Sequence, residues 1–108
     1  MRRKSLGPET LAAVASRFKI LAEPARLHIL NELRARPLNV TELMEGTRLN
    51  QANLSKHLQL LHAHGFVARR RTGSFVVYTL ADPTVFALCD IMCAQLKRRG
   101  SELQRNTR

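Results

Sequence analysis

The sequence predicts a single, mainly α-helical domain that contains one β-hairpin, and three observations support this fold class. The chain has 108 residues, of which 44% are hydrophobic and 24% charged, as is typical of one globular domain. Apolar residues recur with helical spacing along most of the chain, but the spacing changes to two between residues 66 and 80. Proline, glycine and asparagine stand where these segments would begin or end. The expected order is therefore four helices, two strands and a last helix.

Two helices are expected before residue 37. The first carries one apolar stripe with helical spacing, made of Leu11, Val14, Ala15, Phe18, Leu21 and Ala22. Glu23 and Pro24 have the pattern of a cap followed by a first-turn proline, so a second helix is expected to begin there. Its inward residues are expected to be Leu27, Leu30 and Leu33, with Ile29 alongside. Pro37 ends this helix, because proline disfavours helical backbone in the residue before it.

Two further helices follow, joined by a short turn. Asn39 and Glu42 have the spacing of a capping box, which opens a third helix that Gly46 is expected to end. Asn50 is a good cap for a fourth helix, which is expected to stop at Gly65. The inward face of the fourth helix is expected to carry Leu54, Leu58 and Leu61.

The end of the chain predicts a hairpin and a last helix. The segments FVARRR and SFVVYTL flank Thr72-Gly73 and favour two paired strands. Asp82-Pro83 repeats the cap-and-proline pattern and opens the last helix. Its apolar stripe consists of Val85, Leu88, Cys89, Met92, Cys93 and Leu96. Residues 1–7 are expected to be a flexible basic arm, 8–98 the folded domain, and 99–108 a disordered basic tail.

Basic residues are concentrated in the middle of the chain as well as at its ends. The formal net charge is +10. No Asp or Glu occurs from residue 46 to residue 81, a stretch that contains Arg48, Lys56 and the arginines at 69–71. Such a stretch favours a polyanionic partner, the alternative being a solvated basic surface.

A helix, a short turn, a second helix and a basic hairpin make a helix-turn-helix with a wing. Base readout in a major groove requires polar side chains at the start of the second helix, where asparagine and glutamine can bond adenine and lysine guanine or phosphate. The predicted DNA-binding residues are Thr41, Gln51, Asn53, Ser55, Lys56, His57, Arg69, Arg70, Arg71 and Ser74. The alternatives are a merely solvated helix face and, for His57, a structural role.

Three segments, LAEPARLHIL, VTELMEGTRLNQANLSKHLQLLHAHGFV and RRRTGSFVVYTL, resemble the ArsR/SmtB family of bacterial winged-helix repressors. The matching pattern runs from Leu21 to Leu80, and the flanking helices fit in position. The resemblance implies a homodimer through the first and last helices, with each recognition helix in a major groove, and repression that an inducer relieves. The expected interface residues are Leu11, Val14, Phe18, Leu88, Met92 and Leu96.

Cys89 and Cys93 lie four residues apart and therefore share one face of the last helix. Such a pair can bind a soft ion, whereas a disulfide within the helix would be strained. Near a dimer axis the pair could take a thiophilic metal, As(III) or Sb(III), or act as a redox inducer site. The sensor patterns of the ArsR/SmtB family are absent, however, because NVTELM contains no cysteine and no histidine follows His64. Both cysteines are also expected to lie on the buried stripe of this helix, where cysteine often serves as a small hydrophobe.

The sequence disfavours several function classes. It contains no recognisable acid–base pair or glycine-rich phosphate loop, so an enzyme is not expected, and no cofactor is certain. No segment approaches the ~20 apolar residues of a membrane span, so we expect a cytoplasmic protein with no membrane partner. The leading interpretation is a sequence-specific DNA-binding repressor, released from an inverted-repeat operator by a thiol-reactive or metal or metalloid inducer. The alternative is a constitutive DNA- or RNA-associated structural protein without an inducer site.

Overall fold

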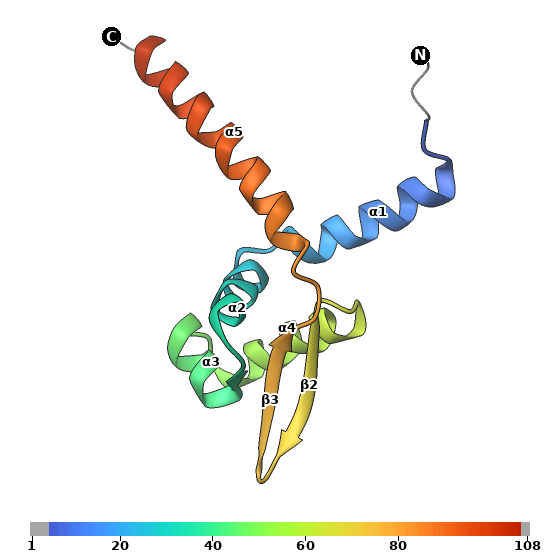
Figure 1. Cartoon of the computed structure of the whole chain (residues 1–108), viewed down its shortest axis with the longest axis vertical. Helices are drawn as coiled ribbons and strands as arrows, with labels where there is room; N and C mark the ends of the chain where they lie inside the picture. The colour runs from blue at the N-terminus through green and yellow to red at the C-terminus, as the bar shows by residue number, and fades with distance from the viewer. Residues whose placement is uncertain (1–4, 107–108) are drawn as a thin grey trace.

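The computed structural model describes residues 5–106. Its elements are α1 (Pro8–Leu21), α2 (Pro24–Ala35), β1 (Leu38–Asn39), α3 (Val40–Thr47), α4 (Gln51–Ala63), β2 (Val67–Thr72), β3 (Phe75–Leu80) and α5 (Val85–Asn106). Helices α2, α3 and α4 pack with the sheet into a central body, as Figure 1 shows. Helices α1 and α5 leave this body at the end opposite the hairpin and diverge from each other (Figure 1).

One hydrophobic core holds the central body together. Its largest fully buried side chains are Ile29, Leu30, Leu43, Leu54, Leu61, Phe66 and Val85. The predicted inward face of α4 is confirmed, since Leu54, Leu58 and Leu61 are all buried. In α2, however, Leu27 is exposed, so the prediction that it faces inward is wrong. Successive residues turn by about 100°, so Ile29, Leu30 and Leu33 already fill the inward arc and Leu27 falls outside it.

The sheet has three antiparallel strands in the order β1-β3-β2, one more than the sequence predicted. Strand β1 is only two residues long and pairs Leu38 with Tyr78, which is too short for a periodic pattern to reveal. In the hairpin, Arg69 stands opposite Tyr78, and Arg71 opposite Val76. Directly paired residues share a face of the sheet, so Arg69 and Arg71 lie on the face of buried Tyr78, and Arg70 on the other.

The caps of α3 and α4 confirm the sequence prediction. Asn39 Oδ1 accepts from the Glu42 N–H at 2.9 Å, and Glu42 Oε1 accepts from the Asn39 N–H at 2.9 Å. The end of α3 differs from the prediction, because the helix passes Gly46 and stops when Arg48 adopts a left-handed conformation with φ 62°. Gly46 instead permits a close approach to α2, since a Cβ there would lie 2.8 Å from the Glu32 carboxylate.

The last helix also extends further than the sequence predicted. It continues to Asn106 and so runs through most of the segment 99–108 that was expected to be a disordered tail. The sequence there has no proline, and its one glycine, Gly100, costs a helix only about 1 kcal/mol. Residues 1–4 of the expected N-terminal arm and residues 107–108 lie outside the described residues. Among the described helices, none is both long and apolar enough to span a membrane.

Candidate nucleic-acid interface

Helix α4 presents a polar face to solvent. Asn50 caps the helix, its Oδ1 accepting from the Asn53 backbone N–H at 2.8 Å. The core side of α4 is fixed by its buried leucines, which leaves the other side to solvent. All four predicted base-reading or phosphate-binding side chains at its start are exposed, namely Gln51, Asn53, Ser55 and Lys56. The amide, hydroxyl and ammonium groups on these two turns can therefore reach a ligand without rearrangement of the core.

The turn between α3 and α4 is fixed by a buried threonine. Thr47 Oγ1 donates to the Leu43 carbonyl at 2.7 Å and accepts from the Leu49 N–H at 3.3 Å. These two bonds hold the end of α3 and the start of the turn in one geometry. Thr41, in the first turn of α3, is exposed, as its predicted role in DNA contact requires.

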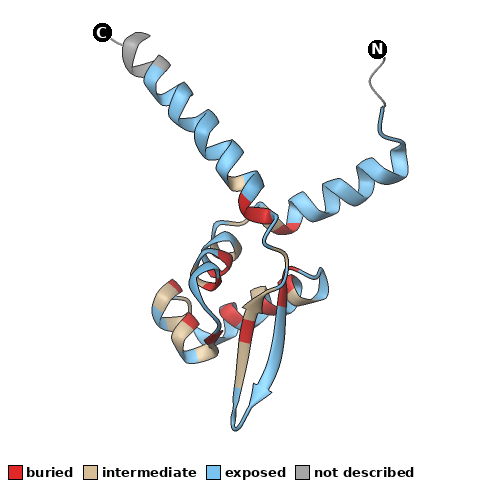
Figure 2. Ribbon diagram, in the orientation of Figure 1, coloured by how far each residue is buried: buried red, intermediate tan, exposed pale blue. Residues whose placement is uncertain are grey.

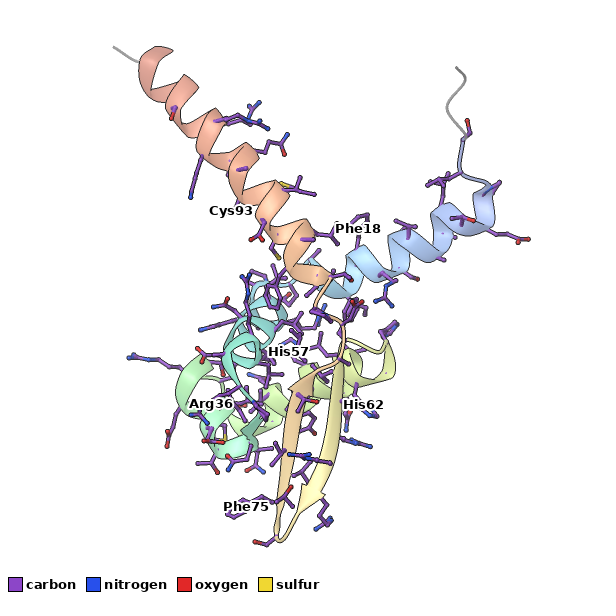
Figure 3. All side chains as sticks on the ribbon, viewed as in Figure 1. Phe18, Arg36, His57, His62, Phe75 and Cys93 are labelled. Atoms are coloured by element: carbon purple, nitrogen blue, oxygen red, sulfur yellow. The ribbon has the colours of Figure 1, made fainter. Side chains whose placement is uncertain are left out.

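The β2–β3 hairpin projects beyond the helices as a wing (Figure 1). Its two-residue loop is Gly73 and Ser74, and Gly73 has φ 63°, as the first loop residue of a type II′ turn does. Arg69, Arg70 and Arg71 are all exposed, as is Ser74 at the tip. Figure 3 shows Phe75, which is also exposed, beside this tip. The wing therefore exposes three guanidinium groups, two of them on the face of the sheet that carries Tyr78.

His57 occupies a different environment from the other predicted DNA-binding residues. It is half-buried, and its Nδ1 lies 3.1 Å from Nη1 of Arg26 in α2. Arginine can only donate, so Nδ1 accepts and a neutral His57 carries its proton on Nε2. Arg26 also donates through Nε to the Ile20 carbonyl at 2.6 Å. The pair ties α4 to α2 and to the end of α1, which favours the structural alternative for His57; no local pattern had pointed to Arg26.

Arg17 connects three segments and was also missed by the sequence analysis. Its Nη1 donates to the His64 carbonyl at 3.0 Å, and its Nη2 lies 3.1 Å from Oδ2 of Asp82. Its guanidinium carbon stacks 4.2 Å from the ring centroid of Phe66. Hydrogen bonds from Thr84 lower the pKa of Asp82, and the charge of Arg17 lowers this pKa further. Arg17 thereby links α1 to the end of α4 and to the loop before α5.

Apolar side chains of α1 and α5 are left uncovered in the single chain. All six expected interface residues are exposed, namely Leu11, Val14, Phe18, Leu88, Met92 and Leu96. Figure 2 shows that both helices are exposed along most of their length, in contrast with the buried residues at their bases. Phe18 lies beside the base of α5 (Figure 3), and together with Val14 and Leu88 it lines a cavity of about 160 Å³. A single chain in water does not usually expose so many neighbouring apolar side chains.

Both cysteines are free thiols, but their surroundings differ. Cys89 is half-buried and packs against the core, whereas Cys93 is exposed, so the expectation that both lie on a buried stripe fails for Cys93 in the single chain. Both line a groove between α5 and α2, which also contains His28. Within residues that the structure describes, no three His, Cys, Asp or Glu side chains are placed to hold a metal ion.

The sequence of this region matches known regulators. Residues 23–69, from the start of α2 into β2, match the family described as "Bacterial regulatory protein, arsR family". HTH-type transcriptional regulator NmtR of Mycobacterium tuberculosis is 41% identical over 85 residues, which cover 79% of this chain and 71% of NmtR. The chain belongs to the ArsR family.

Two solved structures agree with this membership. The crystal structure of Rv0081 from M. tuberculosis superposes with a TM-score of 0.78 at 36% identity, covering 90% of this chain and 97% of Rv0081. The homodimeric winged helix-turn-helix DNA-binding domain of Mb0332 from Mycobacterium bovis (fragment 1–100) gives a TM-score of 0.74 at 29% identity, covering 92% of this chain and 95% of the fragment. The chain is therefore a winged helix-turn-helix transcriptional regulator and not an enzyme.

Proposed function

We propose that this ArsR-family protein is a cytoplasmic homodimeric repressor that reads an inverted-repeat operator with α4 and the wing. The observation that carries the proposal is the exposed polar start of α4. Gln51 and Asn53 extend from a helix whose position is fixed by buried Leu54, and both can bond a base edge with two hydrogen bonds. Arg69 and Arg71 of the wing supply sequence-independent contacts to phosphate, which add affinity and set the register on the duplex.

The proposed dimer forms through α1 and α5. The expected interface residues range from 36% exposed at Val14 to 61% at Leu96, and a two-fold contact between these helices would cover them. The homodimeric state of Mb0332, which superposes over nearly the whole chain, supports this arrangement. A two-fold dimer presents two copies of α4, so the operator is proposed to contain two half-sites in inverted orientation.

We further propose that Cys89 and Cys93 form the inducer site. Both belong to α5, which also carries half of the proposed interface, so chemistry at the thiols can change how the two α4 helices are spaced. An inducer acts only through its preference for one dimer state, and a coupling of about 1–3 kcal/mol weakens operator binding by about 5- to 150-fold. The candidate inducers are thiol-reactive compounds, thiophilic metals, As(III) and Sb(III).

The test begins with selection of an operator from a random duplex pool by the purified dimer. Binding to this operator is then measured with reduced protein, with oxidised protein, and after loading with As(III), Cd(II) or Zn(II). The double variant Cys89→Ser/Cys93→Ser is the control, since serine keeps the size of each side chain while removing the thiol. Release of the wild type alone supports the inducer site. Equal release of both proteins, or of neither, would exclude these cysteines as the sensor.

A further inference from the structure

A groove lies between α2 and α5 within a single chain, beside the face of α5 that is assigned to the proposed dimer contact. Its volume is about 570 Å³, within the range of small-molecule sites, which runs from about 300 to about 1,000 Å³. Its lining includes Leu27, His28, Arg34, Phe86, Cys89, Asp90 and Cys93.

The two sides of α5 have different neighbours. Leu88 lines the cavity that Val14 and Phe18 of α1 share, which is the side assigned to the dimer. Cys89 and Cys93 instead line the groove with α2. At about 100° per residue, Cys93 is turned by about 100° from Met92, so these two side chains lie on adjacent faces of α5. In the single chain the exposed Cys93 thiol is accessible to a small molecule in this groove.

The groove combines apolar walls with a cation, two thiols and the carboxylate of Asp90. Leu27 and Phe86 supply the apolar surface, and the guanidinium carbon of Arg34 lies 4.5 Å from the Phe86 ring centroid. This stacking leaves the N–H groups at the rim of the guanidinium plane, where they can donate to an oxygen of a bound molecule. The described residues offer no third ligand that would complete a metal site beside the thiols. Such a lining suits an organic molecule with a flat apolar body and an acceptor oxygen.

We infer that this groove binds a small apolar electrophile of the quinone or enone class, and that Cys93 adds to it. The Cys93 thiolate forms a C–S bond to the β-carbon, the π electron pair moves onto the carbonyl oxygen, and Arg34 stabilises the resulting enolate. The thiol proton, first released to water, returns to the enolate, so the addition needs no oxidant or reductant. Cys93 is the nucleophile because it is exposed, whereas Cys89 is half-buried against the core. Such an electrophile would be the inducer, and only this effect on operator binding rests on the proposed function.

The test treats the full-length reduced dimer with 1,4-naphthoquinone and follows adduct formation by intact mass and peptide mapping. We expect one adduct per chain at Cys93 in the wild type and in Cys89→Ser, and none in Cys93→Ser. The rate should saturate with quinone concentration, because a complex forms in the groove before the bond does. Arg34→Gln and Leu27→Ala should each lower the rate at low quinone by about tenfold. Arg48→Gln, which removes the same charge outside the groove, should leave the rate unchanged.

Iodoacetamide provides a second readout, since it alkylates thiols without needing an apolar site. Its rate at Cys93 should stay within about twofold of wild type in Arg34→Gln and Leu27→Ala, a spread well below the tenfold loss expected with quinone. Binding in the groove is contradicted if the rate of quinone addition never saturates. It is also contradicted if Arg34→Gln and Leu27→Ala both lower the quinone rate no more than they lower the iodoacetamide rate. Operator binding is measured separately on the purified adduct. Saturable adduct formation with unchanged operator affinity would support binding in the groove and contradict the inducer role of the quinone. Release from the operator by a metal, without saturable quinone addition, would contradict binding in the groove and leave the proposed function intact.

Discussion

The wing arginines give the sharpest quantitative prediction, because the strand register places them on two different faces. Arg69 and Arg71 lie on the face of the sheet that packs against the helices, and Arg70 lies on the opposite face. Since α4 belongs to those helices, we expect Arg69 and Arg71 to contact phosphate beside the groove that α4 enters. Replacing one of them by Gln keeps hydrogen-bonding capacity but removes the charge, twice in each dimer.

The expected effect follows from counterion release. Each phosphate contact contributes about 0.9 to the slope of log K against log salt, so Arg69→Gln or Arg71→Gln lowers the slope by about 1.8 in the dimer. Between about 50 and about 200 mM salt, the wild type should therefore lose about twelvefold more affinity than either variant. The assay is fluorescence anisotropy on one duplex at four or more salt concentrations. Arg70→Gln is the matched control, and a slope change for it as large as for Arg69→Gln would refute the assignment of faces.

Two further predictions concern assembly and acid stability. Phe18→Glu places a charge in the expected interface. The variant should sediment as a monomer at micromolar concentration and lose operator affinity, while the monomer should still melt as a folded domain. A stable dimer would contradict the proposed contact. Glu42 has a pKa held below 4.5 by the Asn39 backbone N–H and then by Arg36, so the ionised form stabilises the fold. Glu42→Gln should therefore lower the melting temperature at neutral pH, and the difference should close as the pH falls below 4.5; a constant difference would exclude this linkage.

The sequence predicted most elements because their signals are local. The capping box at Asn39 and the cap at Asn50 depend only on residues three positions away, and both form as predicted. The predicted end of α3 was wrong, because Gly46 does not end the helix. Its missing side chain instead leaves room for Glu32 of α2. Strand β1 escaped prediction because its two residues gain strand conformation only by pairing with β3.

The contacts that join elements could not be predicted from one sequence. Arg17 reaches residues 47 and 65 positions away, and Arg26 meets His57 across 31 positions, so no local pattern encodes either contact. The exposed side chains at the start of α4 were predicted correctly as exposed, since the buried leucines fix the helix face. The exposure of Cys93 on α5 was not predicted, because apolar periodicity identifies a stripe but does not show which neighbouring element covers each edge of it.

The most direct measurement of sequence-specific recognition by α4 compares Asn53→Ala with Gln59→Ala on the selected operator and on a random duplex. Both remove an exposed amide from α4, but Asn53 lies in the first turn and Gln59 two turns later. Asn53→Ala should raise the operator Kd by about 5- to 150-fold, as expected for the loss of about 1–3 kcal/mol of base readout, and should change binding to the random duplex little. Gln59→Ala should leave both constants near wild type. An equal loss on operator and random DNA for Asn53→Ala would show that α4 does not read the bases through this residue.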